Sequence, residues 1–242
     1  MGAASFAGVL AARLATGESV LRGRSRCDAC GEVLGPLALV PLLSYAAARG
    51  RASCCGARLP AGMPISELAL GGLFVLSYLE LGLAPALPFF LIALVLLAAL
   101  VLYDLAHQIL PPPLLAGFLA ACALTGYLAA PAAFFDSLTL GLALALFLAL
   151  IHFFSGGRAM GLADAPLVFA LALLTGPYAL SGFLFSFWIG AVIGITVLLR
   201  RPRGSRMGVE MPFAPYLAAG FLLAYFTKWN IFGNILNLVG SP

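Results

Sequence analysis

Residues 180–199 read Leu-Ser-Gly-Phe-Leu-Phe-Ser-Phe-Trp-Ile-Gly-Ala-Val-Ile-Gly-Ile-Thr-Val-Leu-Leu and contain no charged side chain. At about 1.5 Å per residue, a helix of this length spans the hydrocarbon core of a bilayer, which is roughly 30 Å thick. Backbone groups in lipid must be paired internally, and the alternation of polar and apolar residues expected of a strand is absent. The stretch therefore predicts a membrane-spanning α-helix.

The whole chain repeats this character. Of its 242 residues, 63% are hydrophobic and only 9% are charged, which is more apolar surface than a soluble domain of this size can bury. Proline, glycine and charged residues divide the chain into apolar segments. We expect an all-α polytopic membrane protein with about eight transmembrane helices, the first of them short, at residues 1–15, 64–81, 85–103, 112–130, 134–154, 162–175, 178–199 and 212–228.

The basic residues indicate an orientation. If the first helix ends in the cytoplasm, the polar segment 16–63 and the loops after the third, fifth and seventh helices are also cytoplasmic. Together with Arg13, these segments contain every arginine of the chain, and only Lys228 falls on the other side. This distribution satisfies the positive-inside rule. It also accounts for the net charge of +4 through membrane topology, so no nucleic-acid partner is expected.

Segment 16–63 holds four of the five cysteines, namely Cys27, Cys30, Cys54 and Cys55. A Cys-x-x-Cys pair followed by a second pair is typical of a zinc site, and the reducing cytoplasm disfavours disulfides. Adjacent cysteines are unusual in the second pair, so ligation by Cys27, Cys30 and Cys55 with Cys54 as a displaced fourth ligand is one arrangement. The alternative is a loop of buried or oxidisable thiols without metal. We expect a small cytoplasmic Cys-rich, zinc-binding module after the first helix.

Two acids stand at helix ends on the same predicted side of the membrane. Asp104 closes the third helix, and Asp164 opens the sixth. Taken singly, an acid at a helix end is often only a cap or a solvated group. Ionisable groups at membrane depth are costly and tend to be functional, however. Two carboxylates that share one proton supply both the base and the acid that peptide hydrolysis requires, so segment 64–242 is predicted to be a transmembrane peptidase domain.

A family resemblance extends over almost the whole chain. Its motifs lie at residues 5–6 (SF), 24–31 (RSRCDACG), 39–45 (LVPLLSY), 49–51 (RGR), 64–68 (PISEL), 104–111 (DLAHQILP), 161–167 (GLADAPL) and 212–216 (PFAPY). Together they resemble the type IV prepilin leader peptidases, which are membrane aspartic peptidases of the Gly-x-Gly-Asp class. The resemblance implies that Asp104 and Asp164 are the catalytic pair.

The same resemblance implies a location and a second activity. Members act in the bacterial inner membrane, where the active site and the Cys-rich module would face the cytoplasm and the partners would be the lipid bilayer and a prepilin or type II secretion pseudopilin. They cleave the leader after a glycine and then methylate the new N-terminal residue, usually Phe, with S-adenosylmethionine as methyl donor. The module at 16–63 would be associated with the methyltransferase, and Glu67 is a weak candidate for that site.

The chain departs from the family pattern at Ala163, which replaces the second glycine of Gly-x-Gly-Asp. Alanine cannot cheaply adopt the positive φ that glycine permits. One alternative is therefore a peptidase-impaired homologue that retains a methyltransferase or assembly role. Another is a proton-coupled transporter, which we rank lower because transport sites usually lie near the membrane midplane.

Overall fold

The structure is a computed structural model of the chain, and it describes residues 7, 8, 10, 27, 29–33, 45, 48–59, 62–158, 160–200 and 211–230. From residue 62 onward the described chain is helical. Its elements are α3 (Gly62–Leu81), α4 (Leu87–His107), α5 (Pro112–Ala129), η2 (Pro131–Ala133), α6 (Phe134–Ser155), α7 (Asp164–Thr175), η3 (Gly176–Tyr178), α8 (Ala179–Arg200) and α9 (Ala214–Thr227). Most of the predicted first helix, 1–15, lies outside the described residues, although residues 7, 8 and 10 are helical.

The predicted all-helical membrane architecture is confirmed. Within the described residues, five stretches are long and apolar enough to cross a bilayer, namely Pro64–Leu81, Leu87–His107, Pro112–Ala129, Pro131–Ser155 and Asp164–Arg200. The predicted number of eight spanning helices is not confirmed. The 12 residues of α7 and the 14 of α9 are too few for a helix that crosses about 30 Å of hydrocarbon by itself.

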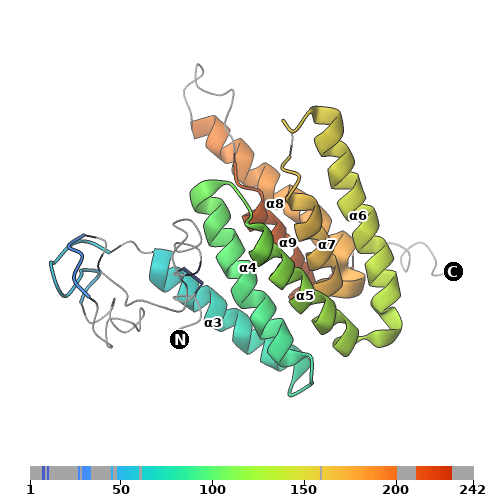
Figure 1. Cartoon of the computed structure of the whole chain (residues 1–242), viewed down its shortest axis with the longest axis horizontal. Helices are drawn as coiled ribbons and strands as arrows, with labels where there is room; N and C mark the ends of the chain where they lie inside the picture. The colour runs from blue at the N-terminus through green and yellow to red at the C-terminus, as the bar shows by residue number, and fades with distance from the viewer. Residues whose placement is uncertain are drawn as a thin grey trace.

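Successive helices from α3 to α9 run in alternating directions, so that α4, α6 and α8 end at the end of the bundle where α5, α7 and α9 begin (Figure 1). The start of α7 is recessed from the level that the ends of α6 and α8 reach (Figure 1). This arrangement brings the last turn of α4 and the first residues of α7 and α9 to one end of the molecule.

The central helix of the bundle is α7, because it packs against α5, α6, α8 and α9. Ten of its 12 residues are buried, as expected for a helix that is apolar on all sides. Glycine allows the close approach of α5: a Cβ placed on Gly126 would lie only 2.5 Å from the carbonyl oxygen of Leu173 in α7. This packing fixes the position of Asp164 at the start of α7.

The last helix of the described chain, α9, is held at its middle and just after its C-terminal end. Along α8, Gly182 approaches so closely that a Cβ there would lie 2.8 Å from the Cα of Phe221 in α9. Small residues permit such contacts between membrane helices. Just after α9, Lys228 pairs with Glu80 of α3 at 2.8 Å. These contacts place the N-terminus of α9 beside the C-terminal turn of α4.

Candidate active site and metal centre

Asp104 lies in the last turn of α4, and only 6% of its surface is exposed. The helix continues one turn beyond the predicted end at residue 103. It stops at Gln108, which has a left-handed backbone (φ 55°) and whose N–H bonds to the carbonyl oxygen of Asp104 at 2.8 Å. The side chain turns toward α9, where its Oδ2 accepts a hydrogen bond from the backbone N–H of Ala214 at 3.2 Å.

Asp164 is the first residue of α7, and 7% of its surface is exposed. Its Oδ2 accepts the backbone N–H of Gly161 at 3.2 Å, and its own N–H bonds to the carbonyl oxygen of Gly161 at 3.2 Å. The loop before this turn is anchored by His152 of α6, whose Nδ1 lies 2.8 Å from the carbonyl oxygen of Met160. Asp164 is therefore oriented by its own turn and by the preceding helix.

The structure brings Asp104 and Asp164 to the same end of the bundle, near enough for their charges to interact. Each carboxylate uses one oxygen to accept a backbone N–H. Neither acid has a basic partner, since Lys228 and Glu80 form the one ion pair of the described chain. The pair therefore has the properties required for proton exchange with a bound substrate, and its catalytic role remains a prediction.

Ala163 has ordinary right-handed backbone angles, φ −69° and ψ −15°. An alanine adopts these angles without strain, so the concern about a positive φ does not apply to this chain. The close contact lies instead at Gly161, where an added Cβ would come within 3.3 Å of Oδ2 of Asp164. The first glycine of the motif therefore has the more restricted position.

Two further titratable residues, Glu67 and His107, have surroundings of their own. Glu67 is buried in α3, with 6% of its surface exposed, and its assignment to the methyltransferase remains a prediction. His107 packs its ring against Tyr103, with 4.6 Å between the ring centroids. The backbone donor Ala214 was missed from the sequence. Its only signal is the Pro215 that follows, which removes the neighbouring N–H group.

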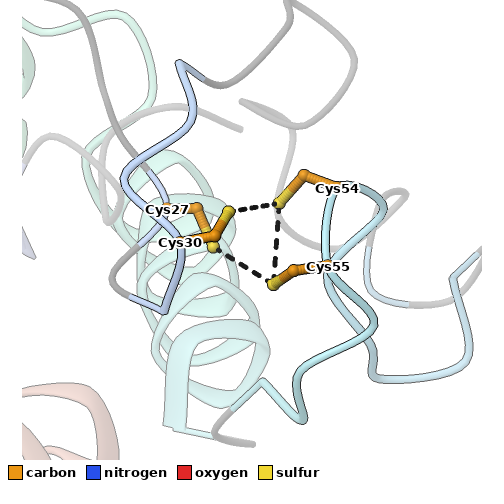
Figure 2. A group of neighbouring side chains, drawn as sticks. All are labelled: Cys27, Cys30, Cys54 and Cys55. Carbon is orange, nitrogen blue, oxygen red and sulfur yellow. Dashed lines mark hydrogen bonds between the residues drawn. The ribbon is translucent and has the colours of Figure 1, made fainter.

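The four cysteines of the N-terminal segment form a single cluster, in which all four sulfur atoms lie within 4.8 Å of one another (Figure 2). The Sγ atoms are separated by 3.8 Å for Cys27 and Cys55, 3.5 Å for Cys30 and Cys54, and 3.9 Å for Cys54 and Cys55. A tetrahedral zinc with bonds of about 2.3 Å separates its sulfur ligands by about 3.8 Å. The cluster could therefore hold a metal ion, and its geometry fits zinc.

Two turns of the same design carry these ligands. In the first, the N–H of Cys27 bonds to the carbonyl oxygen of Glu32, and the N–H of Gly31 bonds back to Cys27, both at 2.8 Å. In the second, Ala52 takes the place of Cys27: its N–H bonds to Ala57, and Gly56 bonds back to it, again at 2.8 Å. Gly31 and Gly56 both have positive φ values, 74° and 70°. Ala52 thus occupies a ligand position without a thiol.

This correspondence explains the adjacent cysteines. Cys55 matches Cys30 in the turn, whereas Cys54 matches Ala29 and supplies the sulfur that Ala52 lacks (Figure 2). The backbone N–H groups of Ala29 and Cys30, together with the thiol of Cys54, lower the pKa of Cys27 to about 7. Hydrogen bonding to Cys27 and Cys30 raises the pKa of Cys54 to about 12. Cys27 is thus the first of the two to become a thiolate, the form that binds metal.

Two protein-family models match consecutive parts of the chain. Residues 1–81 match the bacterial peptidase A24 N-terminal domain, and residues 89–199 match the type IV leader peptidase family. No solved structure gives a significant match.

Curated relatives that match the chain carry the name prepilin leader peptidase/N-methyltransferase. The protein of Bacillus subtilis (strain 168) is 30% identical over 86% of this chain and 83% of its own length. That of Pseudomonas aeruginosa is 32% identical over 82% of this chain and 70% of its own length. The Myxococcus xanthus protein is 36% identical over 82% of this chain, but the match covers only 61% of that relative's length.

Proposed function

Because the chain belongs to the type IV leader peptidase family, we propose that Asp104 and Asp164 are the catalytic pair of a membrane aspartic endopeptidase. Its substrate is a prepilin or a type II secretion pseudopilin, and it cleaves the leader after a glycine. The observation that carries this proposal is the placement of two buried carboxylates, from the end of α4 and the start of α7, at one end of the bundle.

Two carboxylates close together cannot both ionise cheaply, so the pair holds one proton at working pH. The ionised carboxylate takes a proton from water as the water oxygen bonds to the scissile carbonyl carbon. The protonated carboxylate gives its proton to the peptide nitrogen as the carbon–nitrogen bond breaks. The products are the leader, ending in a carboxyl group, and the mature protein with a new amine, and the pair again holds one proton.

The orientation follows from the distribution of charge. At the end of the bundle that holds the aspartates lie Arg158, in the turn after α6, and Arg200, the last residue of α8, whereas Lys228 follows α9 at the opposite end. By the positive-inside rule, this charge distribution supports an orientation in the bacterial inner membrane with the aspartates toward the cytoplasm. A short leader reaches that face while the apolar helix of the substrate stays in the bilayer.

Leader cleavage by Asp104→Ala and Asp164→Ala variants tests the catalytic assignment. Purified protein in nanodiscs is incubated with a prepilin, and the released leader is measured by mass spectrometry. Both variants should lose cleavage, whereas Asp136→Ala, which changes an exposed acid at the opposite end of α6, should retain it. Cleavage by either of the first two variants would exclude the assignment.

For the N-terminal part, we propose the arrangement expected from the sequence, with a first membrane helix at 1–15, a module at 16–63 associated with methylation, and the peptidase domain at 64–242. Cys27, Cys30, Cys54 and Cys55 would hold a structural zinc ion, which cross-links the two turns. When bound, S-adenosylmethionine supplies the methyl group for the new N-terminal amine. Labelled S-adenosylmethionine in the same assay tests this second activity.

A further inference from the structure

The N-terminus of α9 presents one backbone donor to the proposed catalytic pair. The first N–H groups of any helix lack partners within the helix. In α9, the N–H groups of Tyr216 and Leu217 bond to the carbonyl oxygen of Phe213, at 3.0 and 3.1 Å. Pro215 has no N–H. The N–H of Ala214 is the remaining donor, and it bonds to Oδ2 of Asp104 at 3.2 Å.

This hydrogen bond is shielded from water and geometrically fixed. Ala214 is fully buried, and Asp104 is 6% exposed. The packing of Gly182 against Phe221 sets the position of α9 along α8. The donor therefore cannot be replaced by solvent without movement of a whole helix.

A backbone N–H can donate a hydrogen bond but cannot accept one. While the hydrogen bond from Ala214 is in place, Oδ2 of Asp104 must act as an acceptor, so a proton on this acid is carried by Oδ1. The same reasoning applies to Asp164, because the N–H of Gly161 bonds to its Oδ2. Each acid thus has one oxygen that accepts a backbone N–H and one that remains available for the proton.

We propose that Ala214 is a positioning residue whose backbone N–H holds Oδ2 of Asp104, so that Oδ1 carries the shared proton and meets the scissile peptide. This inference rests on the proposed peptidase function. It makes α9 a third element of the active site, joined to α4 by the hydrogen bond from the backbone N–H of Ala214 to the carboxylate of Asp104. Asp104 and Ala214 are 110 positions apart in the sequence.

The direct test replaces the N–H of residue 214 by oxygen. Lactic acid is incorporated in place of Ala214 by nonsense suppression in cell-free synthesis into nanodiscs, which keeps the methyl group and removes only the donor. Loss of the hydrogen bond that positions the carboxyl group of Asp104 should lower kcat about tenfold or more. The alkaline limb of the pH profile of kcat should move to higher pH, because Asp104 carries the shared proton and its ionised form has lost a donor that favours it.

A matched ester at Tyr216 removes a hydrogen bond from the same turn, but one that ends on Phe213. It should leave the alkaline limb of the pH profile in place. If both esters shift the profile equally, or if the ester at 214 shifts neither kcat nor the profile, the positioning role is overturned.

Conventional variants give an independent test. Ala214→Pro also removes the N–H at the first position of a helix, where proline is tolerated, while Ala214→Gly keeps it. Cleavage should be at least tenfold slower in the proline variant than in the glycine variant, with thermal unfolding measured for both. Equal kcat values would overturn the inference. If Asp104→Ala still cleaves, the peptidase assignment itself fails, so the two failures are distinguishable.

Discussion

The N–H of Gly161 and Oδ2 of Asp164 form a 3.2 Å hydrogen bond, and a Cβ on Gly161 would lie 3.3 Å from that same oxygen. Because it has no Cβ, Gly161 can donate this hydrogen bond without crowding the carboxylate oxygen that accepts it. A methyl group there would have to displace the carboxylate by a few tenths of an ångström, and it would place an apolar group against a charged one.

Gly161→Ala should therefore reduce leader cleavage about tenfold, since small misplacements of reacting groups have large effects on rate. The change should appear in kcat and leave the thermal unfolding midpoint within a few degrees of wild type. A variant with wild-type kcat would show that the carboxylate tolerates the displacement.

Ala163→Gly should change kcat by less than about threefold. Ala163 already has right-handed angles (φ −69°), so glycine relieves no strain and only adds backbone freedom before α7. Cleavage of a prepilin by the two proteins side by side is the measurement. A large gain in kcat would instead mean that the wild-type motif is impaired, and it would favour the alternative of a peptidase-impaired homologue.

The two matching turns of the Cys-rich module predict a rescue. Cys54→Ala should weaken zinc binding, because only three thiols remain. Adding Ala52→Cys should restore it, because residue 52 corresponds to Cys27 in the turn. Zinc per chain, measured by elemental analysis after dialysis against a chelator, should be close to one for wild type and the double variant and lower for Cys54→Ala.

Cys122→Ala is a suitable control for this series, since Cys122 is buried within α5, far along the chain from the cluster. It should keep wild-type zinc. If Cys54→Ala retains full zinc, the site uses three thiols, and if the double variant stays depleted, the correspondence between the turns is wrong.

Gly182→Ala should destabilise the protein by about 1–3 kcal/mol, as expected for overpacking, because its Cβ would meet the backbone of Phe221 at 2.8 Å. Gly194→Ala in the same helix adds its Cβ in open space and should not lower stability. Thermal unfolding in nanodiscs compares the two. Equal unfolding midpoints would show that α8 and α9 can separate without cost.

Sequence patterns located the helices from residue 62 onward because prolines and glycines mark their ends. The extension of α4 to His107 was missed because the stop depends on the left-handed backbone of Gln108, a residue with no strong stop signal. The length of α7 shows why the predicted number of eight spans is not confirmed. Apolar composition predicts that a segment enters the membrane, but it does not determine whether a 12-residue helix crosses it alone.

The candidate site was only partly predictable, because part of it depends on tertiary contacts that sequence patterns do not specify. Topology placed Asp104 and Asp164 on one side, because alternating helices must return to it. The contact between Asp104 and Ala214 joins residues 110 positions apart, and a backbone donor leaves no side-chain signature. The place of Cys54 depends on how two turns close against each other, which the spacing of the cysteines does not specify.

The shortness of α7 also bears on what the enzyme demands of its substrate. Its 12 residues rise about 18 Å, some 12 Å less than the hydrocarbon core, and its start is recessed from the ends of α6 and α8 (Figure 1). A scissile bond that meets Asp164 there must be unwound inside the rim of the bundle. Glycine is a poor helix former, so a glycine before the scissile bond lowers the cost of unwinding the substrate. The short length of α7 thus gives a physical reason for the proposed cleavage after a glycine.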